Sequence, residues 1–442
     1  MKNKYRKRIN IVTLGCSKNI VDSEFLIAQL SGNNFEVVHD SNDESAKTVI
    51  INTCGFIKDA KEESINTILN FARAKEAGII DRLFVFGCLA ERYKNELRSE
   101  IPEVDDFFGA KNLKDIIKAA GGNFRDELLG DRIVTTPQHY AYLKISEGCN
   151  RICSYCAIPI IRGKHVSEPV EQLVVQAQKL AAGGVKELLV IAQDSTYYGL
   201  DLYKKQKIAE LLRKLSEVQG IEWIRLHYAY PALFPDDLIC EIRNNPKICK
   251  YLDIPFQHVS DKVLGKMRRG ISKKETYSLI ERIRKEIPGI ALRTTLLAGH
   301  PGETEKAFGE LKQFVEDVRF ERLGVFPYSE EEGTYSALNF PDSISNTRKS
   351  ERANEIMSIQ NRISGDMNLA KKGQYMTVIV DRIEDDFIIA RSEHDSPEID
   401  QEVLIYKTDA SLSVVPGDFA KVKIVDTDDY DLYAHIQANG LC

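Results

Sequence analysis

The sequence predicts an α/β protein made of three successive regions, and three observations lead to this prediction. Apolar strands alternate with amphipathic helices from residue 9 to about residue 120. Six further strand–helix units follow between residues 140 and 329, and short strands with turns fill the chain from residue 373. We therefore expect an N-terminal open parallel α/β sheet, a central partial (β/α)6 barrel and a small C-terminal all-β barrel.

The first region contains five expected strands and four expected helices. The strands are Ile9–Gly15, Phe35–His39, Thr48–Asn52, Leu83–Gly87 and Asp106–Gly109, and the helices are Asp22–Leu30, Asp59–Lys75, Leu89–Glu100 and Leu113–Ala120. Strict alternation of this kind is typical of a parallel sheet with helices on both faces. We place this domain at residues 8–122, followed by a polar, glycine-containing linker that ends near Gln138.

The central region is two strand–helix units short of the closed eightfold barrel. Its expected strands are Ala141–Glu147, Glu187–Gln193, Trp223–Ala229, Tyr251–Gln257, Ala291–Gly299 and Arg322–Ser329. A turn-rich stretch and a helix at about Thr347–Leu369 complete a domain that we place at residues 138–370.

The last region, residues 371–442, changes to short strands and turns. The expected strands are Tyr375–Arg382, Phe387–Arg391, Glu402–Ile405 and Phe419–Val425, which favour an antiparallel barrel. The region has seven Lys and Arg against fifteen Asp and Glu, a net charge of −8. A module that binds RNA is expected to be basic, so the acidic charge favours a basic protein as partner. A merely solvated acidic surface is the alternative.

Composition favours a cytoplasmic protein without a membrane segment. The 442 residues are 43% hydrophobic, and no apolar run approaches the roughly 20 residues that span a bilayer. The basic start, Met1–Arg8, precedes an apolar stretch that is too short for a signal peptide. Nine cysteines in a reducing compartment are not expected to form disulfides.

Three cysteines crowd into one short loop, Cys149, Cys153 and Cys156, directly after the first barrel strand. Active sites of β/α barrels lie on such loops. Three thiolates can bind three irons of a cubane cluster and leave the fourth iron open for the amino and carboxylate groups of S-adenosylmethionine, whose cleavage then yields a deoxyadenosyl radical. A structural zinc normally needs a fourth ligand, for which His165 is the nearest candidate. Tyr155 is either a contact for the adenine or an ordinary buried tyrosine.

Three other cysteines, Cys16, Cys54 and Cys88, each follow the carboxyl end of a predicted parallel strand. Ligands of open α/β sheets collect at those ends, so the three thiols converge if their strands are close in the sheet. The alternative is that each is a small buried hydrophobic residue. Cys240, Cys249 and Cys442 share no such placement, and we interpret them as structural or incidental.

With both sets placed, the chain resembles the methylthiotransferase family of radical S-adenosylmethionine (SAM) enzymes over nearly its whole length. The resemblance is carried by Leu14-Gly-Cys16-Ser-Lys-Asn19, Asn52-Thr-Cys54-Gly-Phe56, Lys144-Ile-Ser-Glu-Gly-Cys149, Ile158-Pro159-Ile-Ile-Arg162-Gly163, Gln193-Asp194, Pro301-Gly-Glu-Thr304 and Tyr328-Ser-Glu-Glu-Glu-Gly-Thr334. The C-terminal module looks like a TRAM domain.

The resemblance implies two 4Fe-4S clusters and SAM as cofactors. Cys149, Cys153 and Cys156 would hold the radical SAM cluster, and Cys16, Cys54 and Cys88 an auxiliary cluster that binds or supplies sulfur. One SAM would donate a methyl group and a second would be the radical source. SAM contacts are expected at Tyr155, Gln193, Asp194 and Arg293, and no catalytic side chain is expected beyond the cluster ligands.

The segment around Cys16 resembles the branch that methylthiolates an aspartate of small-subunit ribosomal protein S-twelve (the RimO type), as does Arg391-Ser-Glu-His-Asp395-Ser-Pro-Glu-Ile-Asp400. His300 and Glu168 depart from the family pattern. The implied partners are that ribosomal protein, an electron donor such as flavodoxin or ferredoxin, and a sulfur donor. Two alternatives stay open, a tRNA adenosine methylthiotransferase (the MiaB type) and a non-catalytic iron–sulfur sensor that binds the ribosome or RNA.

Overall fold

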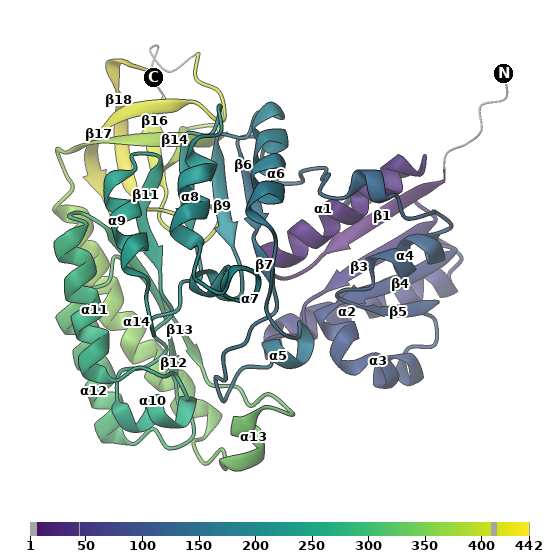
Figure 1. Ribbon diagram of the computed structural model, residues 1–442, viewed down its shortest axis with the longest axis horizontal. Coiled ribbons are helices and arrows are strands. Elements are labelled where there is room, and N and C mark those ends of the chain that lie inside the picture. The colour runs from purple at the N-terminus through teal and green to yellow at the C-terminus, as the bar shows by residue number, and fades with distance from the viewer. Residues whose placement is uncertain (1–6, 44, 408–412, 442) are drawn as a thin grey trace.

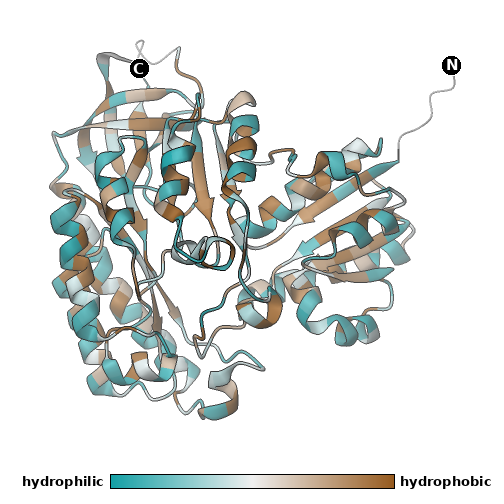
Figure 2. Ribbon diagram, viewed as in Figure 1, coloured by the Kyte–Doolittle hydropathy of each residue, from teal (hydrophilic) through white to brown (hydrophobic). Residues whose placement is uncertain are grey.

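The computed structural model describes residues 7–43, 45–407 and 413–441 and confirms the predicted fold class (Figure 1). A parallel sheet, a partial barrel and a small closed barrel follow one another along the chain. Hydrophobic residues are concentrated on the strands and on the helix faces turned toward them (Figure 2). In the described part of the chain, no helix has the length and apolar character needed to cross a membrane.

The first sheet has the strand order β2-β1-β3-β4-β5, and every neighbouring pair is parallel. Its strands are β1 (Arg8–Thr13), β2 (Glu36–His39), β3 (Thr48–Thr53), β4 (Arg82–Gly87) and β5 (Asp106–Gly109), and its helices are α1 (Ser17–Gly32), α2 (Lys58–Glu76), α3 (Cys88–Glu100) and α4 (Leu113–Ala120).

Helices cover both faces of this sheet because strand side chains alternate in direction. Ile50 packs with residues of α1 and α4, whereas Val49 and Ile51 pack with residues of α2 and α3. Helix α1 begins five residues earlier than expected, and Cys16 is its N-cap residue.

The central sheet has the order β6-β9-β10-β11-β12-β13, parallel throughout. Its strands are β6 (Tyr140–Lys144), β9 (Glu187–Ile191), β10 (Trp223–Leu226), β11 (Ile248–Asp253), β12 (Ala291–Ala298) and β13 (Arg322–Pro327), and a two-stranded hairpin is formed by β7 (Ser146–Glu147) and β8 (Val166–Ser167).

The helices of the central region surround this sheet. They are α5 (Ile158–Ile161), α6 (Val170–Ala182), α7 (Leu200–Tyr203), α8 (Ile208–Ser216), α9 (Asp236–Asn244), α10 (Asp261–Met267), α11 (Lys273–Glu286), α12 (Glu305–Val318), α13 (Tyr335–Asn339) and α14 (Asn346–Leu369). Two short 3-10 helices, η1 (Asp126–Leu128) and η2 (Ser195–Tyr197), lie in the linker and after β9.

Strand β11 differs from the expectation Tyr251–Gln257. It starts at Ile248 and ends at Asp253. Pro255 has no backbone N–H to donate, and Gln257 has a left-handed φ of 71°, so the regular strand cannot continue through this segment.

The C-terminal barrel closes in the order β14-β15-β16-β18-β17. Its strands are β14 (Tyr375–Ile383), β15 (Phe387–Ser392), β16 (Val403–Tyr406), β17 (Phe419–Thr427) and β18 (Leu432–Leu441). Strand β18 was not among the expected strands. It pairs parallel with β16, so the barrel is not wholly antiparallel as expected.

The loop between β15 and β16 packs against the amino-terminal ends of the central strands, opposite the cysteine loop. Asp395 accepts a hydrogen bond from Arg322 Nε (2.8 Å), and Asp400 accepts one from Tyr251 (2.9 Å). Glu398 accepts one from the Tyr140 hydroxyl (2.9 Å). The side chains of Asp395 and Asp400 are therefore buried at this junction, whereas Glu398 remains exposed.

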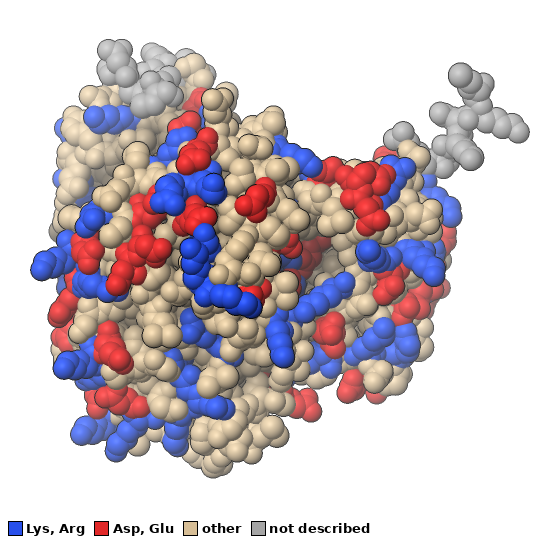
Figure 3. Space-filling model, viewed as in Figure 1, with Lys and Arg blue, Asp and Glu red and all other residues tan. Residues whose placement is uncertain are grey.

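These contacts occupy three of the fifteen carboxylates of the last region, so the preference for a basic protein as partner stays a prediction. Acidic and basic side chains are interspersed on the face of the molecule shown in Figure 3. The net charge of the module overstates the acidity that it offers to a partner.

Candidate functional site

All six cysteines that were expected to bind clusters line one cavity of about 530 Å³. The cavity lies where the carboxyl edge of the first sheet meets the same edge of the central sheet, near α5 in Figure 1. The lining also includes Tyr155, Gln193 and Asp194. The structure thus brings two cysteine sets and three of the four expected SAM contacts to one place.

Cys16, Cys54 and Cys88 follow β1, β3 and β4, which are adjacent strands. Their thiols converge without any local sequence motif because the carboxyl ends of parallel strands share one edge. Cys88 is the first residue of α3 and Cys16 is the N-cap of α1, so both thiols lie at positive ends of helix dipoles, which favour a thiolate.

Glycines permit the close approach of the loops that carry these cysteines. Gly15 has a φ of 93°, and a Cβ placed on it would lie 2.5 Å from the Cys54 Cβ. Gly87 has a φ of 106°, and its added Cβ would lie 2.6 Å from the Thr53 carbonyl oxygen. Any other residue at either position would push the cysteine loops apart.

Cys149, Cys153 and Cys156 lie in the segment between β7 and β8. The amide of Cys149 donates to the Gly163 carbonyl (3.0 Å), and the amide of Cys156 donates to the Cys153 carbonyl (3.2 Å). Arg269 Nη1 donates to Cys153 Sγ (3.3 Å). The loop is therefore held by its own backbone and by a buried cation.

Burial favours the protonated thiol when nothing is bound. It raises the pKa of Cys88 and of Cys156 to about 12 and that of Cys149 to about 11, and it raises the pKa of Cys54 as well. A metal that binds these cysteines would displace the protons, because the thiolate is the ligand form of cysteine.

The donor set fits cubane clusters better than single metal ions. Among the described residues, no group of three or more His, Cys, Asp or Glu surrounds one point closely enough to hold one ion. The thiols instead surround a cavity, as is suitable when each binds a different iron of a cluster. His165 does not line the cavity, and its Nε2 lies 3.0 Å from Ser167 Oγ, so it does not complete a zinc site.

Arg162 joins the two halves of the site. The sequence named it only as part of the matching segment around Ile158 and predicted no role for it. Its guanidinium donates to Asp22 (2.7 Å) and Asn19 (2.6 Å) of α1, to Glu147 (3.2 Å) of the central region and to Cys88 Sγ (3.2 Å). The side chain is 2% exposed. No local pattern in the sequence signals this role, since the partners are up to 143 residues away.

Gln193 and Asp194 are fixed by their neighbours. Gln193 Nε2 donates to Glu147 (2.8 Å), and Asp194 accepts from Arg151 Nε (2.6 Å) and from the Thr196 amide (3.0 Å). Preorganised polar groups of this kind suit the binding of a polar cofactor.

Arg293, the fourth expected SAM contact, does not lie at the cavity. Its Nη1 lies 3.3 Å from Asp253 and its Nε 3.2 Å from Asp400, at the junction with the C-terminal barrel. It is the third residue of β12 and so lies toward the wrong end of the strand for a cofactor at the carboxyl edge.

The remaining residues from the sequence analysis lie away from the lining. His300 is buried behind the cysteine loop, with Nε2 3.5 Å from Ser154 Oγ. The Glu168 carbonyl accepts from the Tyr198 hydroxyl (2.7 Å). Cys240 is exposed on α9 and Cys249 is buried in β11, whereas Cys442 lies outside the described residues.

A second hollow of about 660 Å³ adjoins the cysteine cavity. The two share Phe56, Ile57, Tyr155 and Gln257 as lining residues. Phe326 on β13 is 51% exposed in this hollow. The hollow gives the cysteine cavity a partly apolar approach from the surface.

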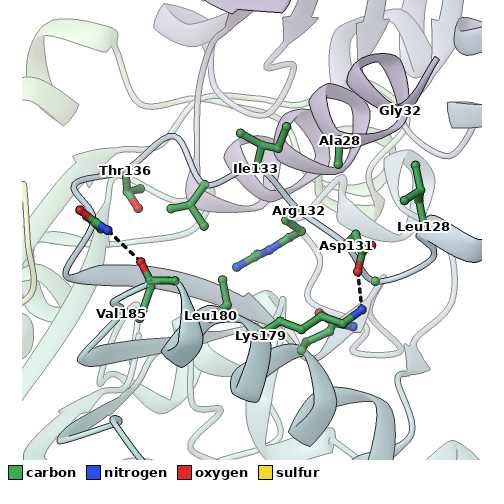
Figure 4. Close-up of a pocket in the computed structure, with 15 residues that line it drawn as sticks. Ala28, Gly32, Leu128, Asp131, Arg132, Ile133, Thr136, Lys179, Leu180 and Val185 are labelled. Carbon is green, nitrogen blue, oxygen red and sulfur yellow. Dashed lines mark hydrogen bonds and ion pairs between the residues drawn. The ribbon is translucent and has the colours of Figure 1, made fainter. Parts of the chain in front are cut away.

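A separate cavity of about 610 Å³ lies between α1, the linker and α6, and no cysteine lines it (Figure 4). Arg132 of the linker forms an ion pair with Glu24 of α1 (3.5 Å), and Gln138 donates to the Gly183 carbonyl (2.9 Å). These contacts attach the linker to both neighbouring regions.

Comparison with known proteins agrees with this site. Residues 8–109 match the uncharacterized protein family UPF0004, residues 143–315 the radical SAM superfamily and residues 373–436 the TRAM domain. The three matched ranges lie within the three predicted domains.

Two solved structures share the fold at low sequence identity. The radical SAM methyltransferase TsrM from Kitasatospora setae, solved with cobalamin and a 4Fe-4S cluster, has a TM-score of 0.55 at 14% identity, covering 75% of this chain and 77% of that one. The cobalamin-dependent radical SAM enzyme OxsB has a TM-score of 0.52 at 13% identity, covering 80% of this chain and 56% of that one.

Curated relatives are much closer in sequence. A protein of Bacteroides fragilis named ribosomal protein uS12 methylthiotransferase RimO is 56% identical over 431 residues, which are 98% of this chain and 99% of that one. Proteins of the same name from Bacteroides thetaiotaomicron, covering 98% of each chain, and from Porphyromonas gingivalis, covering 98% of this chain and 99% of that one, are 56% and 53% identical. The chain therefore belongs to the RimO family of ribosomal protein uS12 methylthiotransferases.

Proposed function

We propose that this chain inserts a methylthio group at an aspartate side chain of small-subunit ribosomal protein uS12. One SAM is the methyl donor and a second SAM is the radical source. The observation that carries the proposal is the meeting of two cysteine sets at one cavity, in a chain that is 53–56% identical to named uS12 methylthiotransferases.

In this proposal Cys149, Cys153 and Cys156 bind the radical SAM 4Fe-4S cluster, and Cys16, Cys54 and Cys88 bind the auxiliary cluster. When bound, the clusters and SAM supply one-electron cleavage, hydrogen abstraction and sulfur transfer. The residues of the chain hold the reacting groups in one enclosed space.

Three side chains supply the expected SAM site. Tyr155, Gln193 and Asp194 line the cavity beside the radical SAM cysteines. A hydrogen bond from Arg151 fixes Asp194, and a hydrogen bond to Glu147 fixes Gln193. Arg293 is not part of the proposed SAM site.

Arg162 maintains the distance between the two cysteine sets. Because it bonds to α1 and to Glu147 at once, neither half can shift without breaking buried charge-assisted hydrogen bonds. Sulfur transfer between the sets requires such fixed geometry.

The adjoining hollow is the proposed approach for the protein substrate. Because the hollow adjoins the cysteine cavity, one side chain of a substrate loop can enter the cavity while the rest of the loop stays in the hollow. An electron donor such as flavodoxin or ferredoxin, a separate sulfur donor and a cytoplasmic reaction with the ribosomal protein belong to the same proposal. The names of the relatives favour this substrate over tRNA, the alternative that the sequence left open.

Mass spectrometry of uS12 and of bulk tRNA from a strain that lacks this gene tests the proposal. We expect uS12 to lose one methylthio group and to regain it when the wild-type gene is restored, while the tRNA is unchanged. A loss of methylthioadenosine from tRNA with intact modification of uS12 would contradict it.

Two cysteine variants separate the proposed roles of the clusters. Cys153→Ala should abolish formation of deoxyadenosine from SAM, because the electron-donating cluster is lost. Cys54→Ala should still cleave SAM but transfer no methylthio group. The reverse pattern would exchange the two assignments.

A further inference from the structure

Lys18 is a buried lysine at the start of α1 whose side chain faces the cysteine cavity. It is 8% exposed and lines the cavity together with all six cysteines. Its Nζ lies 3.1 Å from the centroid of the Tyr228 ring. Within the described residues, no carboxylate lies in ion-pair distance of this ammonium and no acceptor hydrogen-bonds to it.

The other cations of the lining all have acceptors. Arg151 pairs with Asp194 (2.6 Å), and Arg162 pairs with carboxylates of both regions. Arg269 donates to the Pro255 carbonyl and to a cysteine sulfur. Lys18 is thus the one described cation of this cavity without an oxygen or sulfur acceptor.

The ammonium of Lys18 faces the cavity and, among the described residues, has no anion beside it, so it is available to an anionic ligand that enters the cavity. The contact with Tyr228 stabilises the ammonium through the negative face of the ring. At this distance at least one N–H points at the ring, and the N–H donors that point away from it are available to a ligand.

Tyr228 is itself held in an unfavourable backbone conformation. Its φ is 59°, in the left-handed region that non-glycine residues seldom adopt. Its carbonyl accepts from the Ser195 amide (3.0 Å) and its amide donates to Asp253 (3.3 Å), which fix it there. Strain of this kind concentrates where a side chain must be aimed at a ligand.

We infer that Lys18 binds the carboxylate of the substrate aspartate and thereby presents the adjacent β-carbon between the two cysteine sets. This inference rests on the proposed function. The ammonium lies on the helix that follows Cys16, whereas the expected site for the carboxylate of SAM is the open iron of the other set. A carboxylate supplies the anion that Lys18 lacks, whereas an adenine base has no anionic group of its own.

The test is a double-mutant cycle between Lys18 and the reacting aspartate. Iron-loaded wild-type protein and Lys18→Met are titrated anaerobically with labelled uS12, followed by fluorescence anisotropy, using uS12 with the aspartate and uS12 with Asn in its place. Lys274→Met, at an exposed lysine of α11, is the control. Lys18→Arg retains the charge.

We expect Lys18→Met to bind aspartate-bearing uS12 about 10- to 100-fold more weakly, the loss of a charge-assisted hydrogen bond. The Asn form should bind wild type and Lys18→Met equally weakly, Lys18→Arg should retain part of the affinity, and Lys274→Met should match wild type. The KM for the methylthiolation of uS12 should rise with the dissociation constant.

Several outcomes would overturn the inference. One is that Lys18→Met still binds aspartate-bearing uS12 more tightly than the Asn form by the same factor as wild type does. Another is that Lys18→Met loses iron while its preference for the Asp form over the Asn form is unchanged, which would show that Lys18 supports cluster binding instead. A wild-type enzyme that forms no methylthio-aspartate on uS12 would instead refute the proposed function, whatever the behaviour of Lys18.

Discussion

Replacing Arg162 with Met should separate the two halves of the cysteine cavity. The guanidinium makes two hydrogen bonds to carboxylates, one to an amide oxygen and one to a thiol, and the side chain is almost fully buried. Removing one partner of a buried charged set costs about 3–5 kcal/mol. Lys144 still neutralises Asp22 and Glu147, so the lower end, about 3 kcal/mol, applies.

Hydrogen–deuterium exchange measures this loss locally. A loss of about 3 kcal/mol should speed exchange of buried α1 amides by roughly 150-fold, if they open through separation of the two regions. Arg348→Met is the matched control. Arg348 also pairs with three carboxylates, but its side chain is 34% exposed and lies on α14, so its replacement should leave exchange in α1 unchanged. Acceleration below about fivefold in Arg162→Met would refute the view that Arg162 holds the halves together.

Two further predictions concern the clusters and the C-terminal junction. Anaerobically reconstituted protein should hold about eight irons, and a variant with Cys16, Cys54 and Cys88 replaced by Ala should keep about half, by iron analysis. Retention of all the iron would exclude these three as ligands. Burial lowers the pKa of Lys371 to about 8, so between pH 8 and about 10.4 the unfolded chain binds a proton that the native state has lost, and stability should rise with pH by up to about 3 kcal/mol. The free energy of unfolding, measured with urea at pH 7.5 and pH 10, should show this rise in wild type and not in Lys371→Met. The same rise in both proteins would contradict the assignment to Lys371.

The cysteine cavity was largely predictable because its construction follows general rules. Parallel strands that are adjacent in a sheet must end at one edge, so cysteines after β1, β3 and β4 meet there although 72 residues separate the first from the last. The loop with the other three is a local motif. The number of central strands followed from their apolar runs alone.

The residues that complete the site could not be found in this way. The roles of Arg162 and Lys18 depend on which partners lie around them after folding. Arg162 has four acceptors, whereas Lys18 has none among the residues that the structure describes. Arg293 was expected at the SAM site from the resemblance alone, which does not show at which end of its strand the side chain lies. Strand β18 was missed because Gln437, Asn439 and Gly440 interrupt its apolar pattern.

The charge of the last module shows a further limit. A count over residues 371–442 gives an acidic domain, yet Asp395, Glu398 and Asp400 are bound to the central region. Counting charges does not distinguish a carboxylate offered to a partner from one that holds two domains together.

The spacing of the two cysteine sets implies an order in which the protein matures. Cys149, Cys153 and Cys156 span eight residues and can be gathered as soon as that loop exists, whereas Cys16, Cys54 and Cys88 meet only after β1, β3 and β4 have paired. That sheet is complete at Gly109, before the ribosome has made the barrel. If the two cysteine sets bind the proposed clusters, each can therefore acquire its iron independently, and the contacts of Arg162 between the two regions form last.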